Sequence, residues 1–176
     1  MIKHTNLRVL AIAPGTKHLG LAFFEGPELV RFGVKTFPGR KTDQTLVAKV
    51  QNHLDTVLEA HRPHVIAIED VFYAQRRRSP LLRNLVTALG SWGQKRGLRV
   101  VRYSPIAAKE QFCTGKRTRQ VLAEAMVRRY WFLYSFLKPN RTRNYWLQMF
   151  DAVALGAVAV QRAQGRPTIQ RQIQAR

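Results

Sequence analysis

The chain has 176 residues, of which 45% are hydrophobic, and it carries 30 Lys and Arg against 10 Asp and Glu, a formal net charge of +20 at pH 7. This length and composition exclude a wholly disordered chain and fit one globular domain with a real core. So basic a domain repels itself unless a polyanion is near, which makes nucleic acid the leading partner. An anionic membrane surface and an RNA–protein assembly are the alternatives.

Cysteine content and hydropathy indicate the cellular compartment and whether the chain spans a membrane. The single Cys113 excludes an intramolecular disulfide and a cysteine-based zinc site, which favours a reducing compartment, cytoplasmic or organellar. The N-terminal apolar stretch is too short for a secretion signal. The apolar stretch 144–161 is interrupted by Asp151, so we expect a buried helix, a soluble protein and no membrane partner.

The first part of the chain predicts a strand meander. Short apolar or alternating runs end at Pro14-Gly15, Gly26-Pro27 and Pro38-Gly39, which are turn signals. We therefore predict strands at 8–13, 19–24 and 29–37.

The remaining chain alternates between helical and strand patterns. Helices are predicted at 42–60, 81–95, 118–131 and 145–163, with strands at 64–69 and 98–103. The order βββ-α-β-α-β-α-α predicts an α/β fold with a mixed five-stranded sheet and helices on both faces, the ribonuclease-H-like arrangement. We expect one domain over residues 1–164 and a basic flexible tail over 165–176.

Two acidic residues stand out against this background. Glu69 ends the strand Val65-Ile-Ala-Ile, at the kind of sheet edge where ligands gather, although Glu69 and Asp70 also fit the first solvated residues after a strand. Asp151 lies alone in an apolar helix, where a carboxylate must be paired, protonated or bound to a metal. A structural ion pair with one of the many cations is the alternative for Asp151.

Two carboxylates suit a hard divalent cation, Mg²⁺ or Mn²⁺. In a strongly basic protein the natural use of such an ion is phosphodiester hydrolysis, in which paired metals activate a water and stabilise the leaving oxygen. A metal-dependent nuclease is therefore a hypothesis that needs no family knowledge.

Four segments resemble the RuvC family of junction resolvases, in order and at matching intervals between residues 8 and 160. They are Val9-Leu-Ala-Ile-Ala-Pro-Gly with Gly20, Ile66-Ala-Ile-Glu-Asp-Val-Phe-Tyr-Ala, Tyr103-Ser-Pro with Lys109, Gly115 and Gln120-Val121, and Asp151-Ala-Val-Ala. The resemblance implies a homodimeric endonuclease that nicks four-way DNA junctions with Mg²⁺ held by four side chains. It implies that Glu69 and Asp151 are metal ligands and that Phe72 is the aromatic wedge at the junction centre. A core-capping role is the alternative for Phe72, and a helicase partner stays open.

Two positions depart from the family pattern. Ala13 stands where the family has the aspartate of Asp-Pro-Gly, and Gln148 stands where it has an acid or a histidine. Alanine cannot bind a metal, and a glutamine carbonyl is a weaker ligand than a carboxylate. We therefore predict weakened binding of the ion and impaired cleavage. An engineered inactivating substitution and a natural relative that kept only binding are both open, and Gln148 favours the natural case.

Basic residues cluster beside these motifs. Arg76, Arg77 and Arg78 follow Phe72 and Tyr73, and Lys109, Lys116, Arg117 and Arg119 gather near the start of the predicted helix 118–131. We expect both groups, with Tyr73, to bind the DNA backbone, although each single residue also fits a solvated charge. The aromatic segment 130–136 fits either stacking on bases or a core or dimer contact.

Three functional hypotheses remain. The first is a junction-resolving endodeoxyribonuclease scaffold, impaired by Ala13. The second is a non-catalytic protein on the same fold that binds branched DNA or structured RNA. The third is a different ribonuclease-H-like enzyme, such as one acting on RNA·DNA hybrids.

Overall fold

The computed structural model describes residues 7–38, 42–70, 79–137 and 143–165. Its five strands form one sheet in the order β3-β2-β1-β4-β5. The strands are β1 (Arg8–Ala13), β2 (His18–Glu25), β3 (Glu28–Thr36), β4 (Val65–Glu69) and β5 (Arg99–Tyr103). The first three pair antiparallel as a meander, whereas β4 runs parallel to both β1 and β5.

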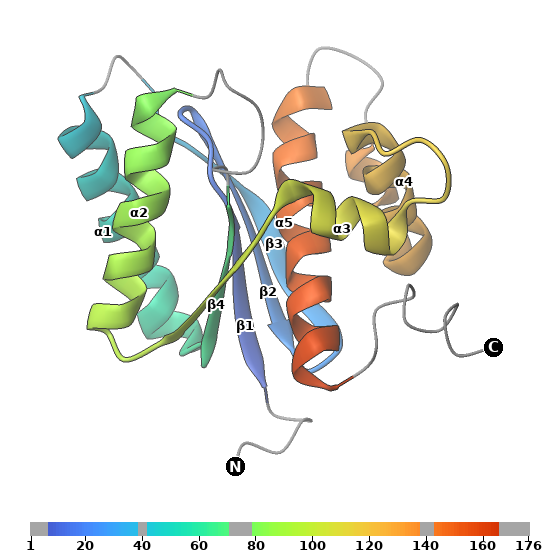
Figure 1. The fold of residues 1–176 in the computed structure, drawn as a ribbon, viewed down its shortest axis with the longest axis horizontal. Helices are drawn as coiled ribbons and strands as arrows, with labels where there is room; N and C mark the ends of the chain where they lie inside the picture. Colours follow the sequence, from blue (N-terminus) through green and yellow to red (C-terminus); the bar gives the residue numbers. More distant parts are fainter. Residues whose placement is uncertain (1–6, 39–41, 71–78, 138–142, 166–176) are drawn as a thin grey trace.

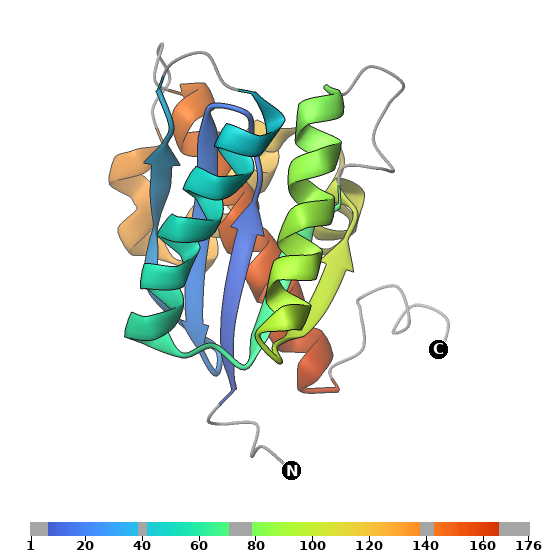
Figure 2. The ribbon, with the colours of Figure 1, turned by 90° about the vertical axis from the view of Figure 1, so that its left-hand side faces the viewer.

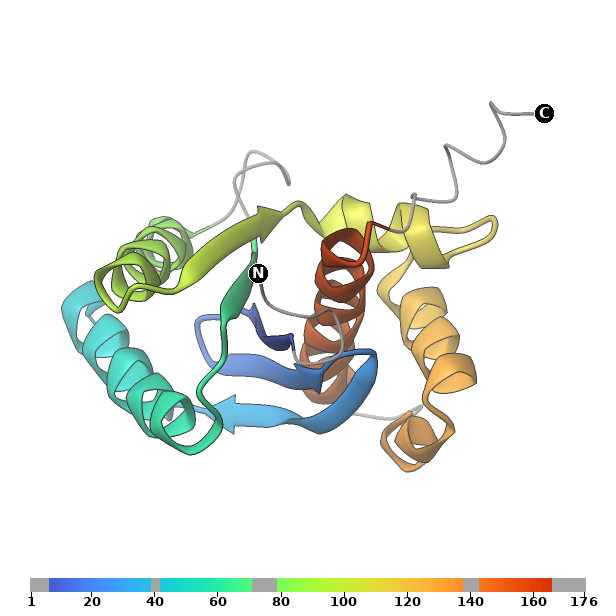
Figure 3. The ribbon, with the colours of Figure 1, turned by 90° about the horizontal axis from the view of Figure 1, so that it is seen from below.

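Helices cover both faces of the sheet, as Figures 1 and 2 show. They are α1 (Asp43–His61), α2 (Pro80–Lys95), α3 (Pro105–Phe112), α4 (Arg119–Arg129), the 3₁₀ helix η3 (Trp131–Phe136) and α5 (Arg143–Ala163). The pair α1 and α2 lies on one face, and α5 crosses the other. The view from below shows α3 and α4 outside α5, away from the sheet (Figure 3).

Side-chain alternation along the central strands divides the core in two. On β1, Leu10 and Ile12 belong to the cluster beneath α1 and α2, whereas Val9, Ala11 and Ala13 belong to the cluster beneath α5. Successive strand residues point to opposite faces, so this division gives the facing of every residue in the strand. Ala13 therefore faces α5.

The fold class expected from the sequence is confirmed, but the expected element order omits a helix. Residues 105–112 form α3, where the sequence pattern indicated only the end of a strand. The Ser104 hydroxyl accepts from the Ala107 amide at 3.3 Å, and Pro105 occupies the first helical turn. A polar N-cap followed by proline is a helix start signal as well as a strand stop. The helix expected at 118–131 ends at Arg129, and η3 follows it.

Within the described residues, no helix is long and apolar enough to cross a membrane. The basic tail expected over 165–176 lies outside the described residues, apart from Gly165.

Candidate active site

Two neighbouring parallel strands end at the site. The ladder of β1 and β4 pairs Ile12 with Ile68, which places Ala13 and Glu69 at adjacent strand ends. Ala67, two residues before Glu69, belongs to the core beneath α5, as Ala13 does. Because strand residues two apart share a face, Glu69 faces α5 with Ala13, and Asp70 faces the opposite way. Asp70 is buried, and its amide donates to the Tyr103 carbonyl at 2.7 Å.

Helix α5 brings the two other family positions to the same place. Gln148 and Asp151 are three residues apart and therefore lie on one side of the helix. The backbone of α5 lies directly on β2 at Gly20, where an added Cβ would overlap the carbonyl of Gln148. Gly20 is also the ladder partner of Ala13. This close approach lets the Gln148 side-chain nitrogen donate to the Ala13 carbonyl at 2.9 Å.

Arg119 binds both of these α5 side chains. Its Nε donates to Oδ2 of Asp151 at 2.8 Å, and a terminal guanidinium nitrogen lies 2.5 Å from the same oxygen. That terminal nitrogen also donates to Oε1 of Gln148 at 3.1 Å. The Asp151 side chain is only 10% exposed, so the ion pair supplies the partner that a buried carboxylate requires.

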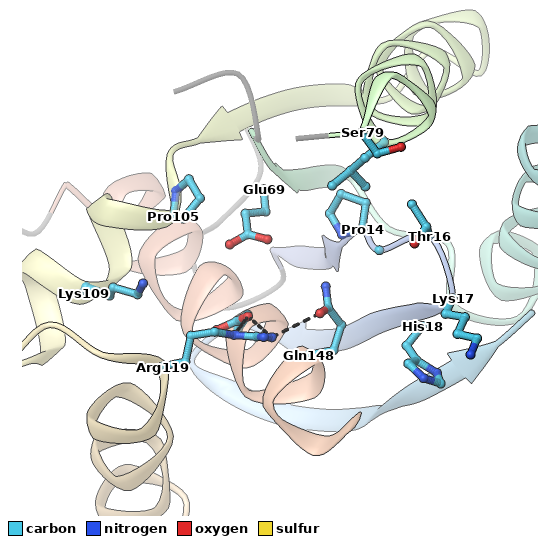
Figure 4. A pocket seen from close by; sticks show the side chains of 13 residues that line it. Pro14, Thr16, Lys17, His18, Glu69, Ser79, Pro105, Lys109, Arg119 and Gln148 are labelled. Atoms are coloured by element: carbon cyan, nitrogen blue, oxygen red, sulfur yellow. Dashed lines mark hydrogen bonds and ion pairs between the residues drawn. The ribbon is translucent and has the colours of Figure 1, made fainter. Parts of the chain in front are cut away.

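These residues line an open cleft of about 620 Å³. Its lining comes from the turn after β1, the end of β4, the start of α2, and helices α3, α4 and α5. Glu69 and Lys109 point toward the space around Arg119, and His18 lies at the far end (Figure 4). The full lining is Pro14, Gly15, Thr16, Lys17, His18, Glu69, Ser79, Leu82, Pro105, Lys109, Arg119, Gln148 and Asp151.

Cations outnumber acids in the cleft. Lys17, Lys109 and Arg119 face Glu69 and Asp151 across it, and His18 adds a titratable ring whose Nδ1 lies 3.0 Å from the Thr36 hydroxyl. A concave surface with an excess of positive charge suits a phosphate of nucleic acid.

The residues present do not fit a two-metal centre. Ala13 offers no ligand, and Arg119 occupies the Gln148 and Asp151 oxygens described above. Glu69 is the other carboxylate among the four family positions, and it lines the same cleft. Nowhere in the described ranges are three or more His, Cys, Asp or Glu side chains grouped so as to hold a metal ion.

Most of the residues predicted for catalysis meet in this cleft. Glu69, Gln148 and Asp151 line it, and Ala13 is fully buried beside it. Of the predicted DNA-binding residues, Lys109 and Arg119 line the cleft, whereas Lys116 and Arg117 are exposed outside it. Phe72, Tyr73, Arg76, Arg77 and Arg78 lie outside the described residues.

Sequence reasoning missed several residues of the cleft. Thr16, Lys17 and His18 line it, and their signal was available because they follow directly on the Pro14-Gly15 turn. The pairing of Arg119 with Asp151 had no local signal, since 32 residues separate the two. Cys113 takes no part in the cleft, and burial raises the pKa of its thiol, which makes it a poor nucleophile.

A family model described as crossover junction endodeoxyribonuclease RuvC matches residues 9–159. The chain belongs to the RuvC family. A RuvC of Koribacter versatilis is 30% identical over 129 residues, 70% of this chain and 78% of that protein. A RuvC of Thermomicrobium roseum is 32% identical over 135 residues, 69% of this chain and 77% of that protein.

Solved RuvC structures share the fold. Thermus thermophilus RuvC in complex with a Holliday junction substrate superposes with a TM-score of 0.68 at 22% identity, covering 92% of this chain and 98% of that one. The yeast mitochondrial Holliday junction resolvase gives a TM-score of 0.64 at 20% identity, covering 92% of this chain and 82% of that one. These matches agree with the mixed sheet and its two helical faces and establish the ribonuclease-H-like fold of RuvC for this chain.

Proposed function

We propose that this RuvC-family chain binds four-way DNA junctions with the face that holds the cleft, and that it hydrolyses them slowly. The observation that carries the proposal is the convergence of the four family positions on one cationic cleft, with alanine at position 13. The net charge of +20 supplies the long-range attraction to DNA. The family name and the junction complex of the Thermus thermophilus relative support branched DNA as the ligand.

In this proposal the cations of the cleft bind and orient the backbone. Lys109 on α3 and Lys17 after β1 stand on opposite sides of the cleft, so a strand that passes between them is held on both sides (Figure 4). Such contacts position a phosphodiester but carry little sequence information. The family resemblance implies Mg²⁺ or Mn²⁺ for cleavage, and the loss of the position 13 carboxylate is the reason that we expect slow hydrolysis.

The test uses a synthetic four-way junction and a linear duplex of equal length. We expect the wild-type chain to bind the junction more tightly than the duplex and to nick it only slowly with Mg²⁺ or Mn²⁺. The double variant Ala13→Asp, Gln148→Asp restores the family pattern and is expected to nick two strands as a pair. Adding Glu69→Gln to the double variant is the control and should abolish the nicks. Equal affinity for junction and duplex contradicts the proposal.

A second candidate function is binding without any capacity for cleavage, to branched DNA or structured RNA. Arg119 favours it, because its guanidinium binds the two α5 side chains that a nuclease of this family needs. Failure of the double variant to nick, with junction binding intact, selects this candidate.

Dimerisation is part of the proposal and rests on the family resemblance. Two copies related by a two-fold axis match the symmetry of a four-way junction and of paired nicks. Light scattering of the free chain should give twice the monomer mass of 20.2 kDa. A monomer both alone and on the junction would contradict it.

A further inference from the structure

We propose that Arg119 replaces the divalent cation of this site, so that the cleft binds a DNA phosphate without Mg²⁺. The inference deepens the proposed function, and its DNA-binding part rests on that function. Its claim about metal binding concerns the free protein and does not depend on DNA.

Arg119 binds one side-chain oxygen of Asp151 and the side-chain oxygen of Gln148. Two guanidinium nitrogens contact Oδ2 of Asp151, and one of them also donates a hydrogen bond to Oε1 of Gln148. The orientation of the Gln148 amide is fixed, because its nitrogen donates to the Ala13 carbonyl. Rotating the amide to move its oxygen away from Arg119 would break that hydrogen bond. Arg119, Gln148 and Ala13 thus form a continuous chain of hydrogen bonds across the site.

The position of Arg119 is set by its helix. It is the first residue of α4, and the Thr118 hydroxyl caps that helix by accepting from the Val121 amide at 3.2 Å. Leu122 and Met126 of α4 are buried in the core that α4 shares with α5. A capped and packed helix start holds the guanidinium in place, so the site is preformed.

The charge of this cation is permanent. An arginine side chain is positively charged in proteins, so Arg119 places a cation beside Asp151 without a metal ion. A divalent ion at Asp151 must displace Arg119 or bind the same carboxylate beside it, and the like charges then repel at short range. This exclusion of a divalent ion is a property of this chain's own residues, because it requires an arginine at position 119.

Arg119 also has a side open to a ligand. Its side chain is 37% exposed in a cleft that Lys109 lines as well. A guanidinium can bind carboxylate and phosphate with different nitrogens, since it presents five donors in one plane. The class of ligand is therefore a phosphodiester of the nucleic-acid backbone.

The first test measures Mn²⁺ binding to the free protein by the electron paramagnetic resonance signal of unbound Mn²⁺. The wild-type chain should bind no stoichiometric Mn²⁺ in the millimolar range, and Arg119→Ala should bind it about tenfold or more tightly. Arg117→Ala is the matched control, because it removes the same charge from an exposed residue that pairs with Glu110 instead. Stoichiometric binding to the wild type, or equal binding by Arg119→Ala and the wild type, overturns the inference.

The second test needs no variant and therefore does not depend on Arg119→Ala remaining folded. Wild-type affinity for a four-way junction is measured in EDTA and in MgCl₂ at matched ionic strength, and the two Kd values should agree within about twofold. Junction binding that requires Mg²⁺ overturns the inference. Absence of junction preference in both buffers instead contradicts the proposed function, and the Mn²⁺ measurement still decides the role of Arg119.

Discussion

The side-chain nitrogen of Gln148 donates to the carbonyl oxygen of Ala13, with 2.9 Å between the two atoms. This bond joins the first turns of α5 to the end of β1, at the level where the α5 backbone lies on Gly20. An acidic side chain at position 13 would lie beside Gln148, which already accepts a hydrogen bond from Arg119. The four positions that the family resemblance assigns to the site thus lie together, but two of them, Ala13 and Gln148, carry no carboxylate.

The contact at Gly20 predicts a stability effect. A methyl group there overlaps the backbone carbonyl of Gln148, which no rotamer change relieves. Gly20→Ala is expected to lower the free energy of unfolding by about 3 kcal/mol, as overpacking of a core does. Urea denaturation followed by circular dichroism measures the change.

Gly33 provides the matched control for that experiment. It lies on β3, and an added Cβ there meets no atom within 4 Å. Gly33→Ala should leave stability unchanged or raise it slightly, because alanine has less conformational freedom to lose in a strand. Similar losses in both variants would show that α5 does not rest on Gly20.

Stability should also fall in mild acid. Burial, with a smaller contribution from Arg8, lowers the pKa of His64 below its ordinary value of 6.5. Its Nδ1 accepts from the Arg8 amide at 3.0 Å, which requires the neutral ring. The unfolded chain takes up the proton first, so the stabilisation is complete above about pH 6.5 and is lost as the pH falls through the lower folded pKa.

The measurement is a series of urea unfolding curves between pH 7.5 and pH 5. His64→Asn keeps an acceptor but does not titrate, so its stability should depend less on pH than that of the wild type. The remaining slope includes His53, whose pKa is lowered by burial and then by Lys35. An unchanged slope in His64→Asn would contradict this assignment.

Lys109 should contribute one phosphate contact. Lys109→Ala is expected to weaken binding to junction and duplex and to reduce the slope of log K against log salt by about 1. Lys49 is the control, because it is exposed on α1, on the opposite face of the sheet. Fluorescence anisotropy at several salt concentrations gives both slopes, and equal effects of Lys49→Ala and Lys109→Ala would argue against binding in the cleft.

Phe72 lies outside the described residues, and its role as a wedge stays a prediction from the family resemblance. Phe72→Ala should reduce the opening of a four-way junction more than the binding of a duplex, because an apolar wedge acts between unstacked bases. Base-analogue fluorescence at the junction centre reports the opening. An equal loss on both DNA forms would make Phe72 a general contact.

The sequence predicts the strands from short-range patterns, and it predicts the site positions from the four segments that resemble the RuvC family. The structure adds the strand register that places Ala13 and Glu69 on one face of the sheet. Helix α3 was missed because Ser104-Pro105 ends a strand and starts a helix with the same residues. An ion pair is the alternative that the sequence offers for Asp151, but Arg119 as its partner was beyond prediction, since the pair depends on how α4 packs against α5 and on no local pattern.

The contacts of Arg119 have an evolutionary consequence. A single change of Ala13 to an acid adds negative charge beside a guanidinium that already holds two partners, and that charge would pair internally. Loss of Arg119 alone removes the ion pair of a carboxylate that is only 10% exposed. If the proposed function holds, faster cleavage is therefore expected to need changes at several positions together, and a change at position 13 or 119 alone is not expected to provide it.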